Sequence, residues 1–320
     1  MGSRISLLCP APSGSHQGNR VTALRWARIL RSLGHRVRIE QNPTGSEIDL
    51  LIGLHARRSA PAVRLFRSRF PEAPLIVALT GTDLYRDLDR SRAALRSLEL
   101  ADRLVLLQPR GRTRLAPAMR RKARVIYQSV AVPTGRARKR PGPFTVCVLG
   151  HLRPVKDPLR TALAVRNLPS GSRIRVVHIG AALQPALAAR ARSEERRNPR
   201  YRWLGDRPRP AALRMLARSD LLVLSSRMEG GANVIGEAAT FGVPVLASRV
   251  EGNLGLLGAR HPGLFPVGDT AALRTLLLRA ENDRSYYARL REGSSRIAPL
   301  FRPAQERRAW RSLLAELGLR

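Results

Sequence analysis

Short apolar runs alternate with helix-like segments along most of this sequence, and that alternation constrains the fold more than any other feature. In the first half, residues 19–34 place apolar side chains at helical spacing and end at Gly34, which is typical of a helix followed by its stop signal. The apolar runs around such segments predict strands at residues 5–10, 36–40, 50–55, 75–80, 104–108 and 124–130. Alternation of this kind predicts a parallel, doubly wound α/β sheet.

A segment rich in proline, glycine and charge, residues 133–143, interrupts the alternation and indicates a linker. Beyond it the pattern restarts, and strands are predicted at residues 144–150, 174–180, 201–205, 221–226, 244–248 and 264–267. A chain of 320 residues with 43% hydrophobic residues suits two cored domains of about 150 residues each. We therefore expect two similar α/β domains with a ligand cleft between them, at the carboxyl ends of the strands. The expected parts are domains 1–135 and 144–302, a linker at 136–143 and an amphipathic helix at about 303–320.

The stretch Ser225–Ala239, SSRMEGGANVIGEAA, carries the clearest functional pattern. It runs from a predicted strand through a glycine pair into a predicted helix, where backbone N–H groups and the helix dipole favour a phosphate. Glu229 and Glu237, separated by seven residues, flank this turn and are suited to accept hydrogen bonds from sugar hydroxyls. Two solvated glutamates in the first turns of a helix would give the same spacing. The glycine pair and the FGVPVLAS that follows favour a nucleotide-sugar site.

This spacing and its surroundings resemble the E-x7-E motif of retaining glycosyltransferases of the GT-B type, which consist of two Rossmann-like domains facing a central cleft. The resemblance implies that Glu237 holds the nucleotide ribose and that Glu229 lies near the donor sugar. It also implies that the C-terminal helix packs back on the first domain.

A second candidate donor element, GHLRPVKDP, follows the strand predicted at residues 144–150. Arg153 and Lys156 are suited to neutralise charge on a leaving nucleotide, although a turn with surface cations is the simpler alternative. The related GT-B motif has glycine, arginine and then lysine, so Lys156 fits, whereas His151 stands where arginine is usual. Whether Arg153 replaces that arginine stays open. We expect the base and ribose near residues 205–209, and the donor-binding residues to be Gly150, His151, Arg153, Lys156, Gly205, Glu229, Gly230, Gly231, Ala232, Asn233, Val234 and Glu237.

In the first half, a small glycine-containing loop at residues 14–20 leads into the first predicted helix, as in an anion site or an ordinary turn with an Asn cap. Five strings, GNRVTALRWARILRSLGHRV, LHARRSA, LTGTDLYRDL, SLELADRLVLLQP and RVIYQSV, resemble the SenB-type selenosugar synthases of selenoneine biosynthesis, which resemble the GT4 family. Members join a UDP-sugar, typically UDP-N-acetylglucosamine, to selenophosphate and yield a 1-seleno sugar.

The resemblance implies a compact cationic pocket for a small anionic acceptor. Simpler roles exist for single members: Arg57 as a surface cation, His55 as a core histidine, and Asp83 as a helix cap. The expected acceptor-binding residues are Gly14, Ser15, His16, Gly18, Asn19, Arg20, His55, Arg57, Thr80, Thr82 and Asp83. The residues expected to act nearest the reacting atoms are His16, Asn19, Arg153, Lys156 and Glu229.

The formal net charge of +35 suggests nucleic acid or an anionic membrane as a partner. However, the basic residues other than Lys122, Lys139 and Lys156 are arginines spread along the whole chain, and the local clusters lack interleaved aromatic residues. We therefore expect small-molecule substrates and downstream enzymes of the pathway as partners, and no specific nucleic acid.

Cys9 and Cys147 lie in apolar runs, as expected for buried, reduced thiols in a cytoplasmic protein. The scattered histidines predict no metal site, no cofactor is expected beyond the co-substrates UDP-sugar and selenophosphate, and no apolar run approaches a membrane span. Two alternatives stay open: a GT4-type enzyme with a lipid or polysaccharide hydroxyl acceptor, and a basic nucleic-acid-binding protein.

Overall fold

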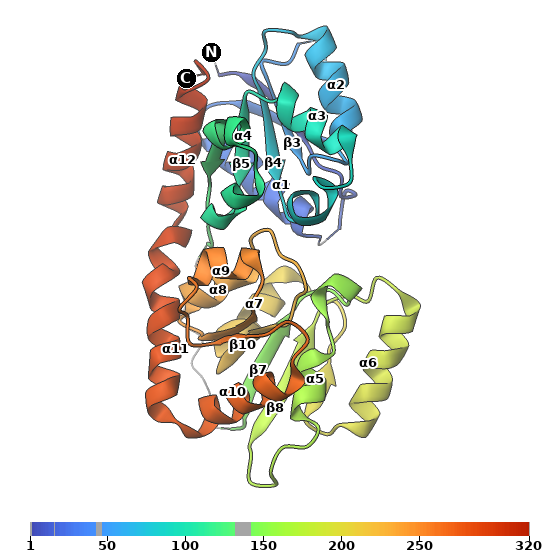
Figure 1. Cartoon of the computed structure of the whole chain (residues 1–320), viewed down its shortest axis with the longest axis vertical. Coiled ribbons are helices and arrows are strands. Elements are labelled where there is room, and N and C mark those ends of the chain that lie inside the picture. Colours follow the sequence, from blue (N-terminus) through green and yellow to red (C-terminus); the bar gives the residue numbers. More distant parts are fainter. Residues whose placement is uncertain (1, 16, 43–46, 132–141, 320) are drawn as a thin grey trace. The chain divides into compact units, whose positions relative to one another are not determined.

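The computed structural model describes residues 2–15, 17–42, 47–131 and 142–319 (Figure 1). The chain forms two compact units: unit 1 comprises Met1–Ser129 and Leu300–Arg320, and unit 2 comprises Val130–Pro299. Each unit contains one six-stranded sheet with helices packed against it. The prediction of an α/β fold with two Rossmann-like domains is confirmed. Residues 136–141 of the expected linker lie outside the described residues.

The sheet of unit 1 has the strand order β2-β1-β3-β4-β5-β6, and every neighbouring pair is parallel. The central strands are buried along their whole length, as both faces of a parallel sheet are covered. The order reverses between β1 and β3, so a ligand is expected at the carboxyl ends of these two strands. The strands are β1 (Arg4–Leu8), β2 (Arg36–Glu40), β3 (Leu50–Leu54), β4 (Leu75–Leu79), β5 (Arg103–Leu106) and β6 (Ala123–Val125).

Helices cover both faces of this sheet. One core joins the sheet to α1 and α12, and the other joins it to α2 and α3 (Figure 1). Helix α1 ends at Ser32. Gly34, just beyond it, has a φ of 97° that lets the chain turn back, while the Gly34 and His35 N–H groups donate to the last carbonyls of the helix. The helices of unit 1 are α1 (Gly18–Ser32), α2 (Ala60–Arg69), α3 (Arg92–Leu100), α4 (Pro117–Lys122) and α12 (Pro303–Ala315).

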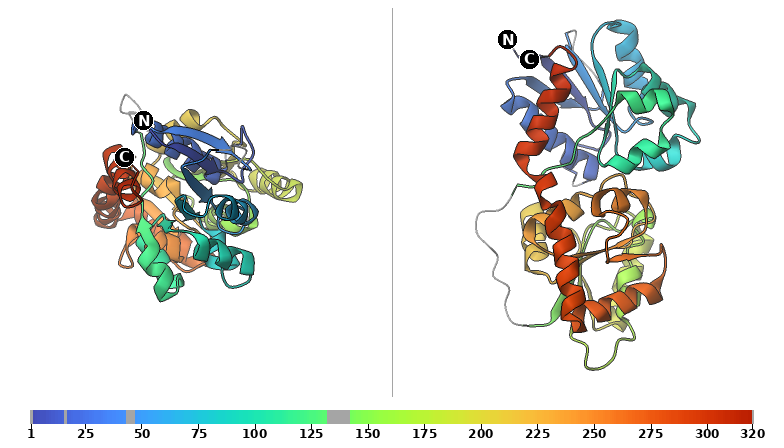
Figure 2. Two further views of the ribbon diagram at one scale, coloured as in Figure 1. Left: turned by 90° about the horizontal axis from the view of Figure 1, so that it is seen from above. Right: turned by 60° about the vertical axis from the view of Figure 1, so that its left-hand side comes forward.

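The C-terminal helix α12 belongs to unit 1 and packs on α1 (Figure 2). Trp310 and Trp26 meet edge to face, with ring centroids 4.8 Å apart. The buried carboxylate of Glu306 accepts hydrogen bonds from Trp26 Nε1 at 2.8 Å and from the Ser129 backbone N–H at 2.7 Å. A large apolar contact and two hydrogen bonds to a buried charge thus fix this helix to the first unit.

One predicted strand is shorter than expected. The pattern at residues 124–130 predicts a strand along its whole length, but β6 ends at Val125. The Ile126 N–H still donates to Leu106 O, whereas the Ser129 N–H turns to Glu306. The apolar side chains of this segment therefore pack without a continuing strand ladder.

The sheet of unit 2 has the order β12-β11-β10-β7-β8-β9, again with all neighbours parallel. Here the order reverses between β7 and β10, which is the point where an open α/β sheet binds its ligand. The strands are β7 (Phe144–Leu149), β8 (Ile174–Ile179), β9 (Tyr201–Trp203), β10 (Leu221–Leu224), β11 (Val245–Ser248) and β12 (Leu264–Phe265).

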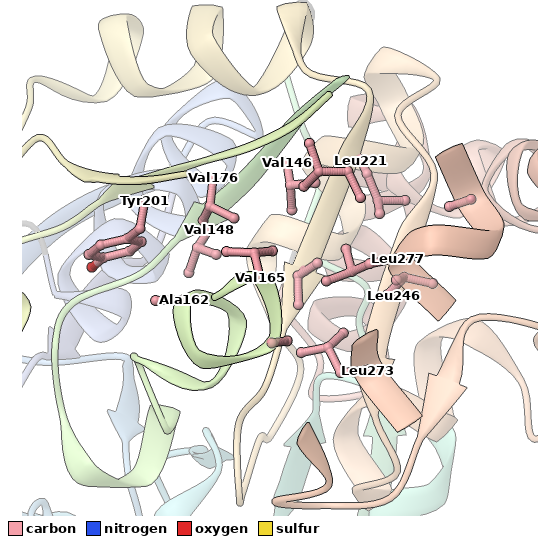
Figure 3. Packing of buried hydrophobic residues seen from close by; sticks show 14 of the residues in the cluster. Val146, Val148, Ala162, Val165, Val176, Tyr201, Leu221, Leu246, Leu273 and Leu277 are labelled. Carbon is pink, nitrogen blue, oxygen red and sulfur yellow. The ribbon is translucent and has the colours of Figure 1, made fainter. Parts of the chain in front are cut away.

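The core of unit 2 packs strand residues such as Val146, Val176 and Leu221 against Val165 of α5 and Leu277 of α10 (Figure 3). Cys147 is buried in β7, and Cys9 is buried in unit 1 just beyond β1; both are free thiols, as predicted. The helices of unit 2 are α5 (Arg160–Val165), α6 (Pro185–Arg197), α7 (Arg209–Arg218), α8 (Asn233–Phe241), α9 (Glu251–Leu257), α10 (Thr270–Asn282) and α11 (Arg284–Ile297).

Candidate functional site

The first element of the site in unit 2 is the turn that follows β7, residues Gly150–Lys156, which we call the donor turn. It ends in a short 3₁₀ helix, Pro154–Lys156, and the next residue, Asp157, has a left-handed backbone with a φ of 44°. Arg160 Nε donates to Asp157 Oδ2 at 2.9 Å, which stabilises the chain at this reversal. Lys156 therefore stands at a defined point beyond the carboxyl end of β7.

The second element follows β10, the neighbour of β7 across the reversal in strand order. Glu229 is only 8% exposed, and its Oε1 accepts hydrogen bonds from Lys156 Nζ at 2.5 Å and from Ser226 Oγ at 2.6 Å. Gly252 approaches so closely that a Cβ atom there would lie 2.1 Å from Glu229 O. Two residues from separate predicted motifs thus meet in an ion pair.

The third element is the N-terminus of α8. Its N-cap residue, Ala232, makes no side-chain capping hydrogen bond, and the Ile235 N–H donates to Ala232 O at 3.0 Å. Gly230 is buried and Gly231, Asn233 and Val234 are half-buried around this helix start. Such a terminus favours an anion.

Glu237 lies in the second turn of α8 and is buried, and its carboxylate pairs with Arg209 at the start of α7. Arg209 was absent from the predicted residues, although its neighbourhood was expected near the ribose. Gly205, which precedes it, has a φ of 69°, a conformation that favours glycine. Both motif carboxylates are therefore paired with a cation contributed by a different turn.

Strand β8 ends beside the donor turn. His178 Nε2 lies 3.1 Å from Gly150 O, and the Ala181 N–H donates to His151 Nδ1 at 3.1 Å. His178 Nδ1 also lies 3.0 Å from the Tyr201 hydroxyl. Burial lowers the pKa of His178 to about 4, so the ring is neutral at pH 7.

In unit 1 the predicted acceptor residues fall at two places. The loop after β1 carries Gly14, with a φ of 80°, and Ser15, while Gly18, Asn19 and Arg20 form the first residues of α1. His16 lies outside the described residues. The N-cap of α1 is Gln17, without a side-chain hydrogen bond, so the helix does not start with an Asn cap.

The other place is the end of β3 and β4. His55 is a non-glycine residue with a φ of 74°, an uncommon conformation that concentrates at functional sites. Its Nε2 lies 3.0 Å from Thr82 Oγ1. Burial is the main cause that lowers the pKa of His55. The buried ring thus faces the residues that follow β4.

Asp83 begins a single π-helical turn, Asp83–Asp87, and its side chain is fully buried. Its carboxylate accepts hydrogen bonds from the N–H groups of Ala56, Thr80 and Gly81, at 2.7 to 3.1 Å. Asp83 therefore fastens the end of β3 to the end of β4.

Asp87, which sequence reasoning missed, is the centre of the charges here. Arg86 Nε donates to Asp87 Oδ1 at 3.1 Å, and Arg57 Nη1 lies 3.5 Å from the same oxygen. Its other oxygen lies 3.9 Å from His55 Nε2. Asp87 lies in a π-helical turn, so its position follows neither the helical nor the strand periodicity of the sequence.

Several arginines of this chain donate hydrogen bonds to backbone carbonyls of their own unit. Arg67 donates to Leu100 O at 3.0 Å, Arg112 to Ala123 O at 2.9 Å, and Arg274 to Ala164 O at 3.0 Å. Guanidinium groups of this kind satisfy carbonyls at the ends of helices and strands. These arginines contribute to the charge of +35 while serving contacts inside their own unit.

Among the described residues, no group of three or more His, Cys, Asp or Glu side chains is arranged to hold a metal ion. None of the helices in the described part of the chain is long and apolar enough to cross a membrane.

Comparison with solved structures supports the same architecture. HepE of Anabaena, in complex with UDP, matches with a TM-score of 0.78 at 18% identity, over 98% of this chain and 100% of that chain. Sucrose-phosphate synthase of Thermosynechococcus elongatus matches with a TM-score of 0.77 at 15% identity, over 99% of both chains. The pneumococcal O-GlcNAc transferase GtfA, in complex with UDP and GlcNAc, matches with a TM-score of 0.69 at 15% identity, over 92% of this chain and 60% of that chain. These similarities concern the fold.

No curated protein matches this sequence. The family model "Glycosyl transferases group 1" matches residues 135–296, which is more than half of the chain and contains both the donor turn and the two motif glutamates. The GT-B expectation is confirmed at the level of family and fold, and the chain belongs to the glycosyl transferases group 1 family.

Proposed function

We propose that this protein transfers the sugar of a UDP-sugar, with UDP-N-acetylglucosamine as the expected donor, to selenophosphate and forms a 1-selenosugar. The observation that carries the donor half is the Lys156–Glu229 ion pair at the reversal in strand order of unit 2, close in sequence to the N-terminus of α8. The acceptor half rests on the resemblance of the unit 1 sequences to selenosugar synthases.

The geometry of unit 2 suits a nucleotide sugar. Lys156 and the first turn of α8 offer positive charge to a diphosphate, and Glu237 offers a carboxylate oxygen to a ribose hydroxyl. The neighbours HepE and GtfA bind UDP in their solved structures, which supports uridine diphosphate as the leaving group. Arg153, in the same turn, is half-buried and is a second candidate for the diphosphate.

The acceptor side needs to bind a small anion. Arg57, whose side chain is 58% exposed, follows the end of β3 and lies beside Asp87. Thr80 and Thr82 lie at the end of β4 and are half-buried. We assign Asp83 to shaping this turn, because its oxygens already accept three backbone N–H groups.

In the proposed reaction the selenium lone pair of selenophosphate attacks the anomeric carbon, a C–Se bond forms, the C–O bond to the diphosphate breaks, and UDP leaves with the bonding electrons. An anionic selenium nucleophile needs no general base. Catalysis then depends on positioning the donor sugar, the role proposed for Glu229, and on stabilising the charge on the leaving UDP, the role proposed for Lys156. Water subsequently cleaves the Se–P bond and gives the selenol and phosphate.

The test is an anaerobic incubation of the purified protein with UDP-N-acetylglucosamine and selenophosphate, followed by mass spectrometry. We expect an ion with the selenium isotope pattern at the mass of the selenosugar, and UDP in equal amount. Parallel reactions with UDP-glucose and with orthophosphate test the donor and the need for selenium. If UDP binds but no selenosugar forms, the acceptor assignment is wrong and a hydroxyl acceptor replaces it.

A further inference from the structure

We propose that His151 and His178 act as positioning residues, forming a clamp that holds the donor turn against the end of β8. The clamp rests on the proposed function of that turn in binding the diphosphate. Neither histidine needs to touch the donor for this role. His151 would then serve the turn itself, in the place where the related motif usually has an arginine.

The donor and the acceptor in each hydrogen bond of the His178 ring can be assigned. A carbonyl oxygen only accepts, so His178 Nε2–H donates to Gly150 O at 3.1 Å. The neutral ring then has an unprotonated Nδ1, which accepts from the Tyr201 hydroxyl at 3.0 Å. The imidazole is 1% exposed, and Tyr201 is buried in the same core. One tautomer of the ring is thus fixed from both sides.

This bond sets the orientation of the peptide after Gly150. A trans peptide is planar, so a carbonyl held toward His178 directs the His151 N–H to the opposite side. The strand end approaches this peptide closely, since a Cβ atom at residue 180 would lie 2.1 Å from Gly150 O. Gly180 therefore allows β8 to approach the donor turn as closely as the hydrogen bond requires.

The His151 half of the clamp acts from the turn toward β8. The Ala181 N–H donates to His151 Nδ1 at 3.1 Å, and the Leu152 N–H donates to Ala181 O at 2.8 Å. The same strand end also holds the other expected donor segment, since the Gly180 N–H donates to Gly205 O at 2.9 Å. The end of β8 thus connects both turns.

The clamp has a functional consequence further along the chain. Between the clamped residues and Lys156 lie only a few residues, and the 3₁₀ helix with Pro154 restricts their conformations. Fixing Gly150 and Leu152 therefore limits where the Lys156 ammonium and the Arg153 guanidinium lie. Loss of the clamp should lower affinity for the diphosphate while Lys156 and Glu229 are still present.

Paired variants at residue 178 test the first half. His178→Gln places an amide N–H near the position of Nε2 and retains a donor for Gly150 O, whereas His178→Asn is too short to reach it. We expect His178→Asn to weaken UDP binding by roughly five- to tenfold in calorimetric titration, as for loss of one hydrogen bond, and His178→Gln to restore most of it. Equal UDP affinity in the two variants would overturn the role of this bond.

Paired variants at residue 151 test the second half, and here the shorter side chain is the one that keeps the hydrogen bond. His151→Asn places an amide oxygen near the position of Nδ1 and retains an acceptor for the Ala181 N–H, whereas His151→Arg restores the residue usual in the related motif and loses the acceptor. The clamp predicts tighter UDP binding by His151→Asn than by His151→Arg. Tighter binding by His151→Arg would show that residue 151 contacts the phosphate, and the clamp would be wrong.

A matched control separates positioning from general stability. His261 is also buried in unit 2, and its Nδ1 accepts from the Gly263 N–H at 3.1 Å. We expect His261→Gln to lower the melting temperature and to leave UDP affinity unchanged.

If the wild-type protein fails to bind UDP, the proposed donor function itself fails. If the wild type binds UDP and all four clamp variants bind it equally well, only the clamp fails. Should His178→Asn not fold, the His151 pair decides.

Discussion

In both units the candidate residues lie at the carboxyl ends of the strands, but the contacts that they make there differ. In unit 2, the reversal in strand order joins Lys156 and Glu229, a cation and a carboxylate that are 73 residues apart in sequence. In unit 1, the strand ends gather polar groups that mostly bind one another, with Asp83 accepting three backbone N–H groups. In unit 2 a motif carboxylate thus pairs with a cation from another turn, whereas in unit 1 the Asp83 carboxylate shapes the backbone of a turn.

This difference has a physical reason. The proposed diphosphate needs cations at fixed positions, and in unit 2 a carboxylate holds each cation in place, Glu229 for Lys156 and Glu237 for Arg209. A small acceptor anion needs a compact site with few contacts. We propose that the left-handed backbone at His55 and the π-helical turn shape such a site. The comparison predicts that substitutions in unit 2 affect donor turnover and that Asp83 mainly affects stability.

The largest effect is expected for Lys156→Met, which removes the charge and keeps most of the side-chain length. We expect kcat/KM for the UDP-sugar to fall by about 10²–10³-fold, as when one group that stabilises transition-state charge is removed. The matched control is Arg166→Met, because Arg166 pairs with the buried Glu194 elsewhere in unit 2. A similar loss of kcat/KM in both variants would refute a specific role for Lys156.

Glu237→Gln should have the next largest effect. Losing a charged acceptor for the ribose is expected to raise KM for the UDP-sugar by about 10–100-fold, with a smaller change in kcat. Glu194→Gln removes another buried, arginine-paired glutamate of unit 2 and should leave KM unchanged. Steady-state kinetics with varied donor concentration measures both. An unaltered KM in Glu237→Gln contradicts the assignment.

Stability should fall in mild acid. Burial lowers the pKa of both His178 and His261 to about 4, from 6.5 when exposed. The unfolded chain therefore binds more protons between these values, and stability is full above pH 6.5 and is lost as pH falls toward 4. At pH 5 the loss is about 2 kcal/mol per histidine. Urea unfolding of the whole protein across pH 4–7, with hydrogen exchange used to follow the amides of unit 2, checks this. An unfolding midpoint of unit 2 that does not change with pH would contradict it.

The smallest effect is expected in unit 1. Asp83→Asn replaces one of two accepting oxygens by a donor that faces backbone N–H groups, and should lower the free energy of unfolding by about 1–3 kcal/mol. UDP affinity should not change. Thermal unfolding and UDP titration on the same sample separate the two properties. A stable variant with weakened UDP binding would remove the distinction between the units.

The sequence predicted what depends on local pattern. Alternating apolar runs predicted both sheets, and the spacing of Glu229 and Glu237 predicted the strand, turn and helix on which they lie. It also placed Lys156 in the same site, since both residues follow strands of one sheet. The family and the fold are confirmed, whereas the individual roles of these residues stay predictions.

The rest depends on contacts between distant segments. Arg209 meets Glu237 only because α7 and α8 are neighbours, and His178 meets Gly150 only because β7 and β8 pair in register. An isolated histidine in an apolar strand carries no signal of its partner. The end of β6 at Val125 was likewise unpredictable, because the Ser129 N–H is taken by a glutamate 177 residues further along.

We expect UDP release and selenium–carbon bond formation to be one reaction. Phosphorus NMR of a mixture of protein, UDP-N-acetylglucosamine and selenophosphate follows both substrates directly. We predict that the selenophosphate and UDP-sugar signals decrease at equal rates while UDP appears in the same amount. UDP release at the same rate without selenophosphate, or a constant selenophosphate signal while UDP accumulates, would show that selenophosphate is not the acceptor.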